Sequence, residues 1–230
     1  MVFYSDTVTF PGATIPQLTG ALAHPDGEGP FPGVIVIHEA YGLNDNIRQI
    51  TRRFAEQGYA ALGVDLFTGH GNRAVCMARL MSGMLFNSLD HGAIKDLKAA
   101  LDYLATQAFV ARNRLGAVGY CMGGSLAIAW ACTDSRLKAI APYYGMNPRP
   151  LEAVARGCPV VGSYPEQDFT AAAGRALDAE LDKLKIDHDI KIYPGAKHSF
   201  FNDQRGSYDP AAAQDSWTRV VAFFEQHIKA

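Results

Sequence analysis

The chain has 230 residues, 48% of them hydrophobic, and a formal net charge of −2 at pH 7. This length and hydrophobic content favour a single α/β domain over residues 1–230 with a sizeable core. The nearly neutral charge and the lack of a basic run argue against nucleic acid or an anionic membrane surface as a partner.

The hydrophobic pattern predicts strands and helices in alternation after a short β-rich start. Apolar runs such as 34–38 are typical of buried parallel strands, and the three- and four-residue spacing over 91–107 is typical of a helix. The predicted strands cover 2–10, 17–24, 34–38, 59–64, 115–118, 137–142, 158–162 and 188–193. The predicted helices cover 46–57, 91–107, 125–130, 170–185 and 211–228. This order implies an α/β fold whose mostly parallel sheet of about seven to eight strands has helices on both faces.

The cysteines are sparse and none belongs to a CxxC pair, which argues against a disulfide framework or a structural zinc site. They are Cys76, Cys121, Cys132 and Cys158. No H-x-H or H-E-x-x-H spacing supports a metal-dependent enzyme. The first residues do not resemble a signal peptide and no apolar run approaches about 18 residues. We therefore expect a cytoplasmic protein in which Cys121 stays reduced.

The segment Gly119–Gly124 connects the strand over 115–118 to the helix that follows it. It reads Gly-Tyr-Cys-Met-Gly-Gly and resembles the nucleophile elbow of α/β-hydrolases, with cysteine in place of serine. Its glycines let strand and helix pass close together at a strained turn that presents Cys121. The N-terminus of the helix favours a thiolate at Cys121 and leaves backbone N–H groups, Met122 among them, for an oxyanion.

Polar residues also follow two later strands of the predicted sheet. Asp168 comes after the strand over 158–162, and His198 after the strand over 188–193. In parallel sheets, ligands bind beyond the carboxyl ends of the strands. The order Cys121, Asp168, His198 matches the nucleophile, acid and histidine of α/β-hydrolases. We expect Cys121 to attack an acyl carbon, His198 to carry the proton and activate water, and Asp168 to orient the imidazole.

Glu39 and Ala40 follow the strand over 34–38, in the loop that supplies the second oxyanion donor of α/β-hydrolases. We expect that donor to be the N–H of Ala40. A carboxylate at Glu39 lies near the nucleophile and can accept its proton, so that a neutral resting thiol resists oxidation. The residues alone leave two alternatives open: Glu39 as an ordinary loop carboxylate, and Asp168 as a cap for the helix near 170.

At this point the chain resembles the dienelactone hydrolase family, also called carboxymethylenebutenolidases. The resemblance runs from about residue 30 to the C-terminus. The combination of Glu39, Cys121 and the Gly-Ala-x-His-Ser-Phe sequence around His198 is its most specific part. The matching segments are 38–44, 58–62, 65–67, 119–124, 143–145, Asp168 and 193–200.

The resemblance implies a cofactor-free hydrolase with a Cys–Asp–His triad and a glutamate partner for the resting thiol. It also implies opening of an unsaturated lactone whose carboxylate is held by arginines. Arg205 matches one such arginine, and Arg79 is a looser match. Tyr144 either lines the pocket or packs at a strand end.

The irregular segment 66–90 is rich in methionine and departs from the family pattern. It indicates a lid or an apolar pocket wall, which favours substrates other than the dienelactone. The alternatives are a carboxylesterase or thioesterase, and a non-hydrolytic thiol-redox or binding module built on Cys121. We expect a small-molecule lactone or ester as the partner, and a monomer or homodimer.

Overall fold

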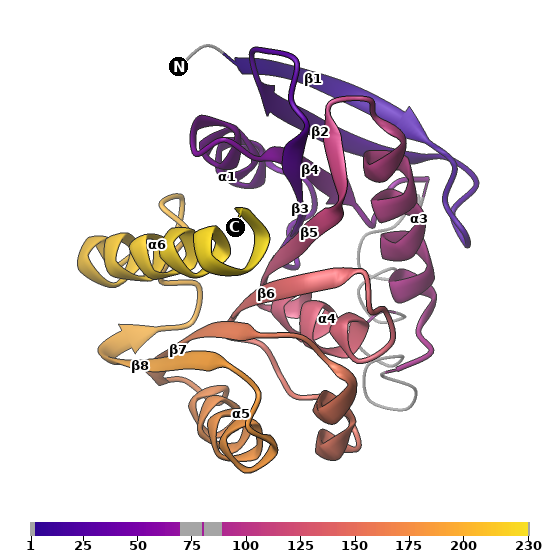
Figure 1. The fold of residues 1–230 in the computed structure, drawn as a ribbon. Helices are drawn as coiled ribbons and strands as arrows, with labels where there is room; N and C mark the ends of the chain where they lie inside the picture. The colour runs from indigo at the N-terminus through magenta and orange to yellow at the C-terminus, as the bar shows by residue number, and fades with distance from the viewer. Residues whose placement is uncertain (1–2, 70–79, 81–88, 230) are drawn as a thin grey trace.

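The computed structural model describes residues 3–69, 80 and 89–229. Eight strands form one sheet, with helices packed against it (Figure 1). The strands are β1 (Phe3–Phe10), β2 (Leu18–Pro25), β3 (Phe31–Ile37), β4 (Ala60–Asp65), β5 (Val110–Tyr120), β6 (Leu137–Tyr143), β7 (Val160–Gln167) and β8 (His188–Lys197). The helices are α1 (Asp45–Glu56), α3 (Gly92–Thr106), α4 (Met122–Ala131), α5 (Ala171–Leu184) and α6 (Pro210–Phe224).

The strands lie in the order β1-β2-β4-β3-β5-β6-β7-β8. β2 runs antiparallel to β1 and β4, and every other neighbouring pair is parallel. The predicted, mostly parallel sheet is therefore confirmed. Because β3, β5, β6, β7 and β8 run in one direction, the loops that follow them gather at one edge of the sheet.

Helices cover both faces of the sheet, as predicted (Figure 1). On one face α1 and α6 pack through buried side chains such as Phe54 and Trp217. On the other face α3, α4 and α5 pack through residues such as Leu101 and Leu177. In α1, α3, α5 and α6 the buried side chains recur at helical spacing and form one stripe towards the sheet, whereas every residue of α4 is buried. Burial of each large apolar side chain contributes about 1.5–3 kcal/mol.

Two details differ from the sequence prediction. A short 3₁₀ helix, η1 (Leu151–Arg156), lies between β6 and β7, and its six residues carry no periodic signal long enough to predict it. The helix predicted over 211–228 ends at Phe224 and continues as a π-helical turn, η2 (Glu225–Lys229).

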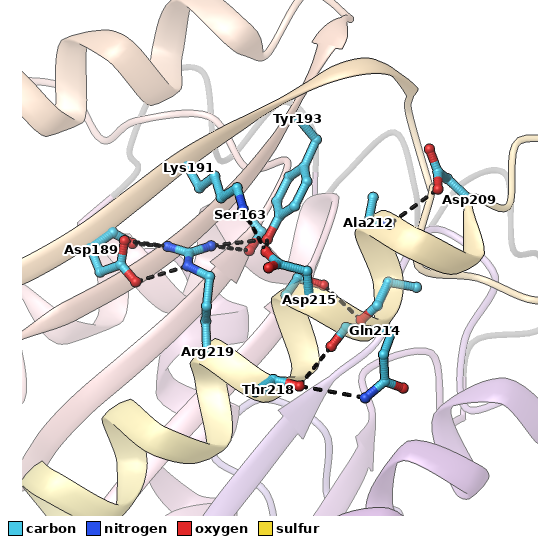
Figure 2. A network of polar contacts seen from close by, with 12 residues as sticks. Ser163, Asp189, Lys191, Tyr193, Asp209, Ala212, Gln214, Asp215, Thr218 and Arg219 are labelled. Carbon is cyan, nitrogen blue, oxygen red and sulfur yellow. Dashed lines mark hydrogen bonds and ion pairs between the residues drawn. The ribbon is translucent and has the colours of Figure 1, made fainter.

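A polar network fixes α6 against β8 (Figure 2). Arg219 of α6 donates from Nε to Asp189 Oδ2 at 2.8 Å and from Nη1 to the Tyr193 hydroxyl at 3.1 Å. Tyr193 in turn donates to Asp215 at 2.7 Å, and Lys191 pairs with the same carboxylate at 2.8 Å. The planar guanidinium makes several bonds in one geometry, so the network sets the position of α6 at this end of the sheet.

Candidate active site

Cys121 lies at the turn between β5 and α4 and has a left-handed backbone, with φ 55° and ψ −114°. Such a conformation is strained for a residue with a Cβ atom. The neighbouring chain passes so close that a Cβ on Gly119 would lie 2.0 Å from the Gly123 carbonyl oxygen. A Cβ on Gly123 would lie 2.4 Å from the Ile37 oxygen. The glycines of the predicted elbow therefore serve close backbone approach.

The resting thiol of Cys121 is protonated at neutral pH. Burial, the largest cause, and the negative charges of Glu39 and Asp168 together raise the pKa of this thiol to about 12. A hydrogen bond from the Met122 backbone N–H opposes them. The helix N-terminus acts in the expected direction, through the Met122 N–H, but desolvation and two carboxylates outweigh it. The expectation of a neutral resting thiol agrees with this pKa.

Asp168 and His198 lie together beyond the ends of β7 and β8. His198 Nδ1 is 2.7 Å from Asp168 Oδ2, and the Thr170 hydroxyl donates to the same oxygen at 2.6 Å. The Asp168 side chain is 4% exposed and that of His198 is 29% exposed. A proton on Nδ1 faces the carboxylate, which leaves Nε2 to act as a base. The N-cap of α5 is Thr170, so the carboxylate of Asp168 is directed to His198 rather than to the helix.

Glu39 is buried, and both of its carboxylate oxygens accept hydrogen bonds. Oε1 accepts from the Ser199 hydroxyl at 2.7 Å and from the Tyr144 hydroxyl at 3.2 Å. Oε2 accepts from the Asn202 amide at 2.6 Å. Three neutral donors thus hold the carboxylate beside the nucleophile, where its charge disfavours the thiolate.

Ser199 and Asn202 are site residues that sequence reasoning missed. Ser199 lies within the motif that revealed His198, with a left-handed φ of 62°, and Asn202 follows four residues after His198. Only their proximity to that motif was a signal in the sequence, because nothing in a serine or asparagine indicates a partner that lies far away in the chain.

The loop after β3 is oriented by His38. His38 Nδ1 lies 2.5 Å from the Glu39 carbonyl oxygen, and the Leu66 N–H donates to Nε2 at 3.1 Å. The carbonyl and the N–H of a trans peptide point in opposite directions. The N–H of Ala40 therefore points away from His38. His38 thus helps to shape this loop.

Tyr144 and Arg205 contact the loops around Cys121. Tyr144 is 1% exposed, its φ is 40°, and its ring centroid lies 4.9 Å from that of His198. This burial supports a packing role for Tyr144, which also bonds Glu39. Arg205 is exposed and places its guanidinium carbon 3.5 Å from the centroid of the Tyr41 ring. Arg79, the other predicted carboxylate-binding residue, lies outside the described residues.

The remaining predictions concern metals and membranes. Within residues 3–69, 80 and 89–229, no group of three or more His, Cys, Asp or Glu is placed to hold a metal ion. Over the same ranges, no helix has both the length and the apolar character to cross a bilayer. Cys121, Cys132 and Cys158 are free thiols, and Cys76 and most of segment 66–90 lie outside the described residues.

Known proteins share this fold along most of the chain. The model of the dienelactone hydrolase family matches residues 18–228. A provisionally named carboxymethylenebutenolidase of Saccharolobus solfataricus is 35% identical, over 91% of this chain and 94% of its own. A crystal structure from Klebsiella pneumoniae, provisionally named a dienelactone hydrolase, has a TM-score of 0.86 and 26% identity, and the match covers 99% of this chain and 100% of that one.

A second crystal structure, a dienelactone hydrolase-like promiscuous phosphotriesterase from metagenomic libraries, also has a TM-score of 0.86 at 26% identity, with 99% of each chain covered. The sheet and these likenesses define an α/β-hydrolase fold and a hydrolase that acts on ester bonds. The chain belongs to the dienelactone hydrolase family.

Proposed function

We propose that this hydrolase opens a lactone or cleaves an ester through a Cys121 acyl-enzyme, with His198 and Asp168 completing the triad. The hydrogen bond of 2.7 Å between His198 Nδ1 and Asp168 carries the proposal. It aligns an imidazole whose Nε2 can take a proton, at the sheet edge where the strained turn presents Cys121.

The reaction begins from the neutral thiol. His198 Nε2 takes the proton of Cys121 as the sulfur forms a bond to the acyl carbon. The N–H groups of Met122 and Ala40 stabilise the oxyanion. The C–O bond then breaks, and His198 donates the proton to the leaving oxygen. Water attacks the thioester with His198 as base, which releases the acid and restores the thiol.

Glu39 keeps the thiol protonated until a substrate is bound. Its charge is one of the causes that raise the pKa of Cys121 to about 12. A redox sensor needs a thiolate with a lowered pKa, so this environment favours the hydrolase over the thiol-redox alternative. Arg205 is the candidate for binding a substrate carboxylate, because its exposed guanidinium lies on the Tyr41 ring and has no carboxylate partner among the described residues.

The test compares hydrolysis of a dienelactone and of p-nitrophenyl acetate by the wild type, Cys121→Ser and Cys158→Ala. We expect Cys121→Ser to lower kcat by at least about 100-fold on every ester or lactone that the wild type cleaves. Cys158→Ala serves as the control because this half-buried thiol lies away from the elbow, facing Leu177 and Leu181. Unchanged turnover in Cys121→Ser would refute the proposal. A different result is that the wild type cleaves p-nitrophenyl acetate but not the dienelactone, with cleavage of the ester lost in Cys121→Ser. That result would support the mechanism and exclude the dienelactone as a substrate.

A further inference from the structure

Large hydrophobic side chains are exposed at the edge of the sheet where Cys121 lies. Among the described residues, Tyr41, Met146, Phe169 and Tyr208 are each more than a third exposed. The first three lie on the loops that follow β3, β6 and β7. Tyr208 instead lines a separate cavity of about 100 Å³ between α1 and the start of α6. The exposed apolar surface thus gathers mainly around the candidate active site.

Phe169 is the most exposed of these side chains, at 70%. It directly follows Asp168 and stacks on the imidazole of His198, with an interplanar angle of 16° and centroids 5.5 Å apart. A phenyl ring with this exposure adds little to the core, so its position beside His198 has no explanation in packing alone.

In acyl transfer by this triad, the leaving group of the substrate lies next to the Phe169 ring. Asp168 occupies Nδ1 of His198, so the leaving oxygen must take its proton from Nε2 at hydrogen-bond distance, about 3 Å. The carbon atoms attached to that oxygen then lie within a few ångströms of the imidazole. Phe169, stacked on the same imidazole, is the apolar surface next to them.

Met146 is a second exposed apolar side chain, on the loop that follows β6. It is 43% exposed and follows Tyr144, whose ring contacts His198. The Asn147 amide donates to the Ala173 carbonyl in the first turn of α5 at 2.8 Å, which ties the Met146 loop to the segment that carries Phe169.

We propose that Phe169, with Met146 beside it, is a specificity-determining surface for an apolar alcohol portion of the substrate. The preferred substrates are esters or lactones whose alcohol carbon is aromatic or part of an alkyl chain. This inference rests on the proposed hydrolytic function and adds the class of leaving group to it.

The experiment measures kcat/KM for methyl, hexyl and phenyl acetate in the wild type, Phe169→Ala, Phe169→Leu and Tyr208→Ala. All three esters form the same acetyl-enzyme, so differences among them report the acylation step and the leaving group. For each ester, the kcat/KM of the variant is divided by that of the wild type, which removes the intrinsic reactivity of the ester from the comparison. Tyr208→Ala is the matched control, because it removes an exposed aromatic side chain outside the site.

We expect Phe169→Ala to lower kcat/KM for hexyl and phenyl acetate roughly tenfold and to leave methyl acetate unchanged, since an apolar contact of this size discriminates by about that factor. Phe169→Leu should restore most of the hexyl acetate activity. An equal loss on all three esters would mean that Phe169 only positions His198, and no loss would mean that it contacts no substrate; both outcomes overturn the inference and leave the hydrolase intact. Absence of any Cys121-dependent ester cleavage in the wild type would overturn the proposed function and the inference with it.

Discussion

At the scale of single residues, Glu39 affects the protonation of Cys121, the residue that we propose as the nucleophile. The thiol is half-buried near a carboxylate that three neutral donors hold in place. Both factors disfavour the thiolate. In the proposed mechanism, the neutral thiol of the free protein is a weak nucleophile that needs His198 as a base, and it resists oxidants between turnovers.

Removing the charge of Glu39 should make Cys121 more reactive towards an alkylating agent. Glu39→Gln keeps the size of the side chain, and its new NH₂ group can face the Ser199 and Tyr144 hydroxyls, which accept as well as donate hydrogen bonds. The pKa of Cys121 then falls, and the thiolate fraction at pH 8 rises roughly tenfold for each unit of that fall. The measurement is the rate at which iodoacetamide labels Cys121, followed by peptide mass.

The control for this experiment is Glu56→Gln, which removes an exposed carboxylate at the end of α1. It should label at the rate of the wild type. Labelling of Glu39→Gln that is no faster than that of Glu56→Gln would show that the charge of Glu39 does not hold back the thiolate.

At the scale of elements, the crossing of β5, α4 and the end of β3 depends on glycine. Gly119→Ala should lower the free energy of unfolding by about 3 kcal/mol, because its Cβ would overlap the Gly123 backbone and neither segment can move alone. Gly206→Ala is the matched control, since its Cβ would meet nothing within 4 Å. Urea unfolding of the two variants measures the difference, and similar midpoints would contradict the close approach.

Hydrophobic periodicity predicted most of the helices and strands but not their full arrangement. The strands and helices named above fall within a few residues of the ranges predicted from the sequence, because buried runs and helical spacing are local properties. The short helix η1 was not predicted, because its six residues are too few to show a periodic pattern. Which helices share a face of the sheet was also beyond local pattern, since that depends on the order of the strands.

At the scale of the whole molecule, many buried tyrosines and cysteines share one response to pH. Burial raises the pKa of Cys132 to about 11 and that of Cys158 to about 12, and it raises the pKa of Tyr120, Tyr143 and Tyr164 above their ordinary value. The folded chain therefore keeps protons that the unfolded chain releases above about pH 9 for cysteine and pH 10 for tyrosine. The stabilisation that these protonated groups give the folded chain is fully present below pH 9. It is lost as the pH rises towards their pKa values in the folded chain.

We therefore expect the urea midpoint to fall between pH 9 and pH 11 and to change little from this cause between pH 7 and pH 8. Tyrosinate absorbance and the loss of far-ultraviolet circular dichroism should follow one transition for the buried tyrosines, because these side chains ionise only when the chain opens. Complete tyrosine titration near pH 10 with the circular dichroism unchanged would contradict this.

The sequence by itself determined the α/β order of elements and the positions of Cys121, Asp168 and His198 after strands, because hydrophobic period and turn composition are local. It also carried the family, through motifs that lie in register along the chain. The tertiary structure alone decided the surroundings of these residues. Glu39 bonds side chains that lie 105 to 163 residues away, and the desolvation that keeps Cys121 protonated depends on every element packed around it. Burial and long-range hydrogen bonds arise only when distant segments meet, which is why the resting state of the thiol could not be predicted from the residues that flank it.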